Sequence, residues 1–484
     1  MHSPGSVDHT TAPAVDERAG NRLVWLLVAA TFVVFLNETT MGVALATVMA
    51  DFGIDPRTGQ WLTTAFMLTM AVVIPVTGWL MQRLRTRTVF VTALVLFCTG
   101  TAAAGLAPSF GLLVAGRIVQ ASGTAIMLPL LMTTLMTVVP AERRGTTMGN
   151  VSLVISVAPA VGPTLSGSLL ATVGWRGIFA VMLPIALVML AVGLRQVTDL
   201  GSPGDAPLDV VSVPLSALGF GGLVYGLSQA GADSTGGGMP LPPVAAVTIG
   251  IVALGLFAWR QVRLQRVERA MLDLRAFRHR GFTVSLLVML ALMGALFGVV
   301  VVLPLYLLGV LHASPLTVGL LLLPGGLLMG LLGRPVGAWY DRHGPRPLVV
   351  PGVVLTSAAI WALVTVDQNT PLWRIFGCHV LMSLGLALVF TPLFTLSLSA
   401  VPPPLYPHAS ALLGSLQQVA GAAGTALSIT VMASGATAAM ASGVAGDAAT
   451  AQGMRLAFLA GALLSLVGVG AALFVRPLSD PDPA

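Results

Sequence analysis

The sequence predicts an all-α integral membrane protein made of two six-helix bundles with two further helices inserted between them. Three observations predict it. The chain of 484 residues is 56% hydrophobic and only 9% charged, with a mean hydropathy of +0.92, whereas a soluble protein carries roughly a quarter charged residues. Apolar runs long enough to cross a bilayer recur along the whole chain. The arginines between these runs fall mostly on one side of the membrane that the runs would cross.

The spans follow from the length of each apolar run. A helix needs about 20 apolar residues to cross the hydrocarbon layer. Charged residues, prolines and glycines divide the chain into fourteen such runs, and this even number places both termini on one side. The predicted spans lie near 23–48, 61–81, 88–106, 110–138, 148–171, 176–194, 210–229, 242–260, 282–310, 316–340, 347–366, 371–400, 407–433 and 455–475.

The distribution of arginine predicts the orientation. With the N-terminus inside, most arginines lie in cytoplasmic segments, as the positive-inside rule requires. The exceptions are Arg57, Arg176, Arg374 and Arg455, which fall outside, and Arg117 and Arg334, which lie within spans. The chain contains no lysine and is rich in Ala, Gly and Arg, a composition typical of a GC-rich bacterial genome. We therefore expect a bacterial cytoplasmic (inner) membrane protein with both termini in the cytoplasm.

An internal repeat predicts the division of the chain. GWLMQRLRTRTVF (78–90) and GAWYDRHGPRPLV (337–349) align Gly78 with Gly337, Arg83 with Arg342 and Arg87 with Arg346. Each copy follows the second span of a six-span set, and duplicated bundles are typical of secondary transporters. The predicted segments are a cytoplasmic tail (1–21), an N-terminal bundle (22–200), two inserted helices (201–268), a C-terminal bundle (269–476) and a second cytoplasmic tail (477–484).

Composition also excludes several kinds of chemistry. Without lysine the chain cannot form a G-x-x-x-x-G-K-[ST] phosphate loop. Cys98 and Cys378 lie in apolar spans of opposite halves, so they read as small hydrophobic residues and not as a disulfide or a metal pair. The net charge of +6 is explained by membrane topology and does not indicate nucleic acid. We expect no cofactor and no bound metal.

Four motifs then carry a resemblance to a known family. Residues 337–346 match the cytoplasmic-loop motif G-x-x-x-D-R-x-G-x-R of the major facilitator superfamily, and Gln82 and Arg85 interrupt the first copy. RIVQASG (117–123), APAVGPTLSG (158–167) and LNETTMGVALATV (36–48) resemble that superfamily's motifs in spans four, five and one. The whole chain resembles the fourteen-span drug–proton antiporters (EmrB/QacA type). In that family's first-span motif an Asp is usual where this chain has Asn37, and here the acid stands one place later, at Glu38.

Glu38 is the one acidic residue well inside a predicted span, and Arg117 lies at comparable depth in span four. Burial in an apolar environment favours the protonated carboxyl group, whereas a nearby guanidinium favours the carboxylate. A movement that changes their separation would therefore change the affinity of Glu38 for a proton. The alternative is a permanent ion pair that holds the helices together; Arg117 could also hold backbone carbonyls.

Other polar residues are candidates for the substrate cavity. Asn37, Thr39 and Thr40 flank Glu38, and either substrate binding or helix–helix hydrogen bonding would explain them. In the second half His379 is better explained as an interhelical histidine. The remaining cavity candidates are Gln120 in span four and Gln417 and Gln418 in span thirteen.

Two motifs are expected to influence the change between the inward-facing and outward-facing conformations. Gly162 and Pro163, with Gly167, predict a kink in span five, and the resemblance implies that this segment helps to seal the cavity in antiporters; ordinary membrane-helix packing is the alternative. A cytoplasmic latch is expected from the two repeat copies, although the arginines alone could simply set the topology. Its residues are Gly78, Arg83 and Arg87 in one copy and Gly337, Asp341, Arg342, Gly344 and Arg346 in the other.

The predicted function is export of a drug or antibiotic by alternating access, driven by the proton gradient. The expected partners are a lipophilic small molecule, protons and the lipid bilayer, and we expect a monomer. A proton-coupled uptake symporter of the same fold is the alternative, although the GPTLSG segment speaks against it. A membrane-embedded enzyme is less favoured, because no second buried acid and no metal-spaced His/Cys set converge with Glu38.

Overall fold

The computed structural model is all-helical and describes residues 17–199, 207–229, 241–444 and 446–476. Most of the predicted N-terminal tail, the whole predicted C-terminal tail and parts of the inserted segment lie outside these residues. Residues 17–21, which we expected in the tail, form the first turn of α1. The first six long helices are α1 (Glu17–Phe52), α2 (Pro56–Arg83), α3 (Thr86–Gly105), α4 (Phe110–Val138), α5 (Arg144–Thr172) and α6 (Arg176–Gln196).

The inserted segment follows as a shorter helix and a long one. The shorter helix is continuous from Ser212 to Ser228 and contains a π-helical turn, so its parts are α7 (Ser212–Ser216), η2 (Ala217–Gly221) and α8 (Gly222–Ser228). The long helix is α9 (Pro243–Leu264), followed by the 3₁₀ turns η3 (Gln265–Val267) and η4 (Leu274–Arg278). The last six helices are α10 (Arg280–Gly309), α11 (Pro315–His343), α12 (Arg346–Leu363), α13 (Leu372–Ser399), α14 (Tyr406–Ala441) and α15 (Asp447–Ala472).

Twelve helices of the described residues are long and apolar enough to cross a membrane, and the bent α5 makes thirteen. The predicted seventh span corresponds to the run from Ser212 to Ser228, which is apolar but shorter than the others. The count of fourteen therefore stays a prediction. The last predicted span begins earlier than expected, at Asp447, so Arg455 lies inside α15 and not in a loop. Its Nε donates a hydrogen bond to the carbonyl of Val364 at 3.2 Å.

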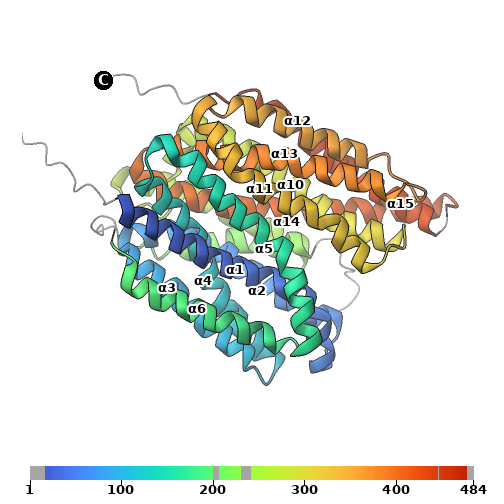
Figure 1. Cartoon of the computed structure of the whole chain (residues 1–484), viewed down its shortest axis with the longest axis horizontal. Coiled ribbons are helices and arrows are strands. Elements are labelled where there is room, and N and C mark those ends of the chain that lie inside the picture. Colours follow the sequence, from blue (N-terminus) through green and yellow to red (C-terminus); the bar gives the residue numbers. More distant parts are fainter. Residues whose placement is uncertain (1–16, 200–206, 230–240, 445, 477–484) are drawn as a thin grey trace, which may run out of the picture.

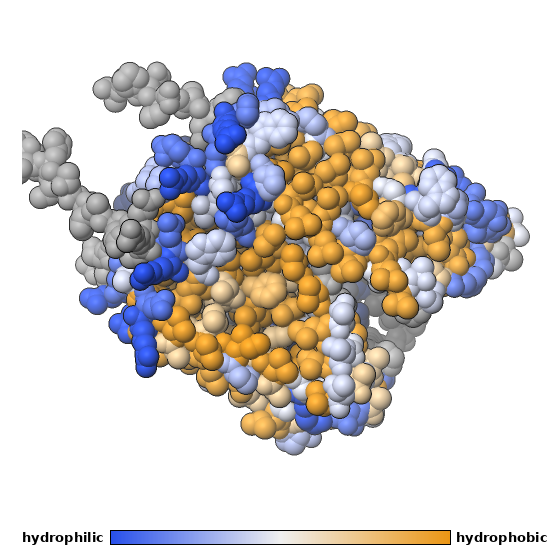
Figure 2. All heavy atoms as spheres, in the orientation of Figure 1, coloured by the Kyte–Doolittle hydropathy of each residue, from blue (hydrophilic) through white to orange (hydrophobic). Residues whose placement is uncertain are grey.

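The helices pack as two groups, α1–α6 and α10–α15, which meet along two seams (Figure 1). One seam joins α5 to α11, and the other joins α2 to α14. Hydrophilic residues gather at the end where α1 begins and the described chain finishes (left in Figure 2), whereas the flank between the two ends is apolar. We call this the basic end, because exposed arginines such as Arg85, Arg342 and Arg346 lie there.

At the basic end the two groups are in close contact. A Cβ added to Gly337 of α11 would lie 2.0 Å from the carbonyl oxygen of Gly145 in α5, and one added to Gly149 would lie 2.1 Å from that of Gly333. Only glycine permits backbones to approach this closely. The second seam is closed at the same end, because a Cβ added to Gly78 of α2 would lie 3.1 Å from Nδ1 of His408 in α14. Beside it, Thr133 of α4 and Ser410 of α14 hydrogen-bond at 3.0 Å.

At the opposite end the groups separate. Gly167 and Gly319 each lie eighteen residues, or five helical turns, beyond Gly149 and Gly337 on the same faces of α5 and α11. A Cβ added to either would meet nothing within 4 Å. Figure 2 shows the surface notched between the two lobes at this end (right). We call this opening the cleft.

Candidate functional site

The centre of the N-terminal bundle holds a buried guanidinium. Arg117 of α4 is 2% exposed, and its Nη1 donates to Oδ1 of Asn37 at 3.2 Å and to Oε1 of Gln120 at 2.5 Å. Gln120 in turn donates to the hydroxyl of Thr101 at 2.7 Å. The guanidinium also lies over the ring of Phe66, 4.1 Å from its centroid. Neutral acceptors and an aromatic face therefore replace the water that this charge has lost.

Glu38 lies beside this network without joining it. Its charge interacts with that of Arg117, but no ion pair or hydrogen bond links the two side chains in the part of the chain that the structure describes. Its Oε2 is buried and has no hydrogen-bond partner there. A buried carboxyl oxygen without a partner carries a large desolvation cost when it is ionised. The arrangement thus places a carboxyl oxygen without a described partner beside a buried guanidinium.

The rotation of α1 turns Glu38 away from lipid. Trp25 and Val43 are 55% and 41% exposed and lie eighteen residues apart, so they mark the outward stripe of the helix. Glu38 lies about 140° around the axis from that stripe at 100° per residue. Gly42, one turn further along on nearly the same face, looks into open space. Glu38 therefore faces the interior. The open space at Gly42 lies one helical turn from it, toward the end of the molecule that is opposite the basic end.

The polar residues next to Glu38 in the sequence differ in their hydrogen-bond partners. Asn37 is fully buried and contacts Arg117, and its Nδ2 has no partner among the described residues. The Thr39 hydroxyl donates within α1 to the carbonyl of Leu36 at 3.0 Å, and to that of Ala158 in α5 at 3.4 Å. The Thr40 hydroxyl donates to the Asn37 carbonyl at 2.8 Å. The Thr39 hydroxyl therefore contacts α5, whereas the Thr40 hydroxyl bonds within its own helix.

α5 crosses α1 at its glycine–proline segment. A Cβ on Gly162 would lie 2.2 Å from the Thr39 hydroxyl, so the close crossing requires glycine. One turn later the Ser166 hydroxyl donates to the carbonyl of Thr40 at 2.8 Å. The parts of this helix before 160 and after 163 are bent by 40° relative to each other, around the position of Pro163. Gly167, at the cleft, lies beyond this bend.

A small cavity of about 30 Å³ lies between the bundles, on the side of Glu38 that faces the basic end. Its walls come from α1, α2, α4, α13 and α14 and are mostly apolar; among them are Phe35, Met70 and Phe394. Gln417 lines it, is 9% exposed and has an Nε2 without a partner in the described chain. Gln418 does not line it, and Gln120 is occupied by Arg117. A cavity of this size is large enough for one water molecule.

The predicted latch is built around one carboxylate. Asp341, at the end of α11, accepts hydrogen bonds from the backbone N–H of Gly145 at 2.7 Å, the backbone N–H of Thr146 at 2.8 Å and the Thr146 hydroxyl at 2.6 Å. These donors belong to the first turn of α5, whose free N–H groups and helix dipole favour an anion. Asp341 therefore caps a helix of the other bundle.

The other latch residues differ in their roles. Gly78 and Gly337 both lie at crossings between the bundles, with Gly78 against His408 of α14. Gly344 ends α11 with a φ of 76°, which favours glycine. Arg87 instead binds inside the N-terminal bundle, to the carbonyl of Leu194 and through its backbone N–H to Asp199. Arg342 and Arg346 are exposed, as is Arg83, which has an interaction partner.

Sequence reasoning missed the partners of these groups. Phe66 beneath Arg117 and the Gly145–Thr146 turn that receives Asp341 carry no motif of their own. Asp341 and Gly145 lie almost 200 residues apart, and only the packing of α5 on α11 brings them together. In the part of the chain that the structure describes, no cluster of three His, Cys, Asp or Glu side chains could hold a metal ion.

Two helix bundles around a cleft, with an unpartnered acid beside a buried guanidinium, define a membrane transporter. Comparison with known proteins agrees. The sequence matches the Major Facilitator Superfamily over residues 27–425. The chain belongs to this superfamily, and is a multi-pass membrane transporter and not an enzyme.

Individual relatives span nearly the whole chain. It is 37% identical to the lincomycin resistance protein LmrB of Listeria monocytogenes over 452 residues, which cover 92% of this chain and 95% of that protein. It is 35% identical to LmrB of Bacillus subtilis over 474 residues, 96% of this chain and 98% of that protein. Among solved structures, the proton:xylose symporter XylE matches with a TM-score of 0.65 at 16% identity, over 96% of this chain and 97% of XylE, a likeness in fold alone.

Proposed function

We propose that the protein exports a lipophilic drug or antibiotic in exchange for protons, by alternating access across the bacterial cytoplasmic membrane. The observation that carries the proposal is Glu38, whose unpartnered carboxyl oxygen lies beside Arg117 on the inward face of α1. The relatives named as lincomycin resistance proteins support drug export. Lincomycin is therefore the first compound to test. The fourteen-span antiporter subtype and a monomeric state are part of this proposal.

The basic end is proposed to face the cytoplasm, with both termini on that side. The excess of arginine at this end supports the orientation, because positively charged segments are retained inside. The described conformation, closed at the basic end and open at the other, is then outward-facing. In it Glu38 would take up a proton from the outside, and substrate would leave through the cleft.

The coupling follows from electrostatics. When Glu38 is protonated, Arg117 has only neutral contacts among the described residues, namely the oxygens of Asn37 and Gln120 and the ring of Phe66. Movement to the inward-facing state would let Glu38 release its proton toward the cytoplasm and approach Arg117 as a carboxylate. No cofactor is needed, since the proton gradient supplies the driving force. The uptake symporter remains the second candidate, because the direction of transport depends on gradients and not on the fold.

The test is Glu38→Gln, which keeps the shape of the side chain but cannot ionise. In inverted membrane vesicles we expect proton-gradient-driven accumulation of lincomycin to be lost, while binding of the compound is retained. The matched control is Asp51→Asn, because Asp51 is an acid on the same helix that pairs with Arg176 at 2.8 Å near the helix end. Undiminished accumulation by the Glu38→Gln protein would eliminate this assignment.

A further inference from the structure

The inserted helices lie against one of the two seams between the bundles. The run α7–η2–α8 packs on both α2 and α14, the helices that form the second seam. Its inward residues Phe220, Val224 and Tyr225 are 3%, 1% and 8% exposed. On its outer side α9 packs along it and exposes Ile251, Val252 and Trp259, as a lipid-facing helix does. The inserted pair therefore separates the α2–α14 seam from the bilayer.

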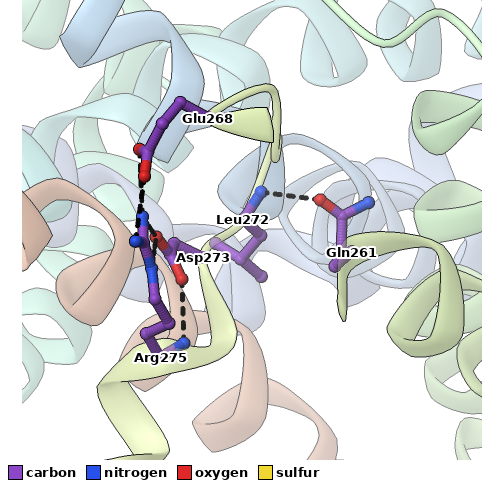
Figure 3. Close-up of polar contacts among 5 residues, drawn as sticks. All are labelled: Gln261, Glu268, Leu272, Asp273 and Arg275. Carbon is purple, nitrogen blue, oxygen red and sulfur yellow. Dashed lines mark hydrogen bonds and ion pairs between the residues drawn. The ribbon is translucent and has the colours of Figure 1, made fainter. Parts of the chain in front are cut away.

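The inserted helices are held to each other and to the loop that follows α9 by directional polar contacts at the basic end. Arg260 of α9 binds Asp209 with two hydrogen bonds of 2.6 Å, and Gln261 donates to the Ser212 hydroxyl at 2.6 Å. Oε1 of Gln261 also accepts the backbone N–H of Leu272 at 3.1 Å (Figure 3). These bonds fix α7 and the loop after α9 to α9 itself.

The loop after α9 is in turn anchored in the C-terminal bundle. Arg275 binds Asp273 and Glu268, which closes the loop on itself (Figure 3). Met271 and Leu272 are 0% and 1% exposed, and the loop packs on α10 and α14. His408 of α14 is itself buried, 3% exposed, at this end of the helix. The packing of the loop thus attaches the inserted pair to the C-terminal bundle.

Away from the basic end, the inserted helices contact α2 through aromatic and aliphatic side chains. Tyr225 stacks on Trp61 with ring centroids 6.1 Å apart, and Gly221 faces the side chains of Leu68 and Val72. Such apolar surfaces can slide past one another by small shear movements, whereas displaced hydrogen bonds between buried groups leave unpaired donors and acceptors.

We propose that the inserted pair is a cover over the α2–α14 seam that moves with the C-terminal bundle and slides over α2. A lipophilic substrate then exchanges between the bilayer and the cleft only at the other seam, between α5 and α11. In the view of Figure 1 no described helix lies in front of that seam, and a Cβ added to Gly167 or Gly319, on its two sides, meets nothing within 4 Å. The statement about substrate rests on the proposed function; the statement about movement does not.

The movement is tested by distances between spin labels on exposed positions: Val188 of α6, Val252 of α9 and Val467 of α15. The labels are compared under conditions in which the Val188–Val467 distance changes, so that the bundles are known to have moved. We expect the Val252–Val467 distance to stay constant and the Val188–Val252 distance to change. A constant Val188–Val252 distance, or a change in both, would overturn the proposal. The measurement needs neither a substrate nor a proton gradient, so it stands even if the proposed function fails.

The route is tested by two matched substitutions, Gly319→Trp at the α5–α11 seam and Gly255→Trp on α9. Both glycines are exposed, helical and open at the Cβ position. We expect Gly319→Trp to slow the transport of a fluorescent dye dissolved in the bilayer several-fold and to spare a water-soluble substrate, with Gly255→Trp resembling the parent protein. Equal losses for both kinds of substrate, equal effects of the two substitutions, or no effect of Gly319→Trp would overturn the route.

Discussion

The contact between Asp341 and α5 makes a quantitative prediction about the balance between the two conformations. Its carboxylate accepts three hydrogen bonds from the first turn of a helix in the other bundle. Loss of a helix cap costs about 1 kcal/mol, and loss of an anion at a helix N-terminus costs a further 0.3 to 1 kcal/mol, as an estimate for a partly exposed site. These contacts exist only while the basic end is closed, so the substitution shifts the equilibrium between states.

Asp341→Asn keeps one acceptor oxygen and loses the charge, so we expect the closed state to be destabilised by about 1 kcal/mol, roughly a fivefold shift in the equilibrium constant. Asp341→Ala removes the cap as well, and we expect about 2 kcal/mol, roughly a thirtyfold shift. The assay is the distance distribution between spin labels at Leu194 and Leu473, two exposed residues of opposite bundles at the basic end. The population with the longer distance should rise in that order.

The matched control for this experiment is Asp447→Asn. Asp447 begins α15 and pairs with His312 at 2.8 Å, so the same charge is removed at a helix start, but within one bundle. The control should leave the distribution unchanged. The reasoning would be refuted if Asp341→Asn and Asp341→Ala left the distribution as it is, or if the control shifted it equally.

Three further predictions concern packing, recognition and pH. Gly149→Ala, whose new Cβ would lie 2.1 Å from the Gly333 carbonyl oxygen, should open the basic end in the same spin-label assay, whereas Gly470→Ala, which meets open space, should not. Gln417→Met should weaken binding of lincomycin in an equilibrium binding assay more than Gln418→Met does, and equal effects would contradict a role for the cavity amide. Hydrogen bonds from Arg260 lower the pKa of Asp209 to about 2. Its ionised form therefore stabilises the fold above pH 4, by about 1 kcal/mol for a pair that is partly exposed to solvent, and this contribution is lost as the pH falls from about 4 to about 2. Asp209→Asn should lower the stability of α7–α9 in hydrogen exchange at neutral pH, with a difference that disappears near pH 2.

Sequence reasoning identified several central groups but not their contacts. Glu38 and Arg117 stood out because charged groups are costly in an apolar span, and the structure puts both in the interior near each other. It pairs Arg117 with Asn37, however, and leaves Oε2 of Glu38 without a hydrogen-bond partner among the described residues. Adjacent residues of a helix point about 100° apart, so which of two neighbours meets a third helix depends on how the helix is rotated.

The latch shows the same division. The repeat predicted that Gly78 and Gly337 are equivalent, and each lies where a helix of one bundle crosses the other. We expected residues of both copies to form latches between the bundles. In the structure Arg87 binds within its own bundle, and Asp341 makes the contact between the bundles. A carboxylate that caps a distant helix leaves no spacing signal, since its donors are backbone N–H groups that every residue but proline has.

The sequence alone determined the class of this protein, the approximate limits of most helices and the presence of one embedded acid. Bilayer thickness and the cost of burying charge act on each segment separately, so these properties can be predicted from local composition. The tertiary structure decided which seam is covered, which end is closed and which polar groups remain unpartnered. Those features depend on the rotation and crossing of helices, which many weak contacts between remote segments set together.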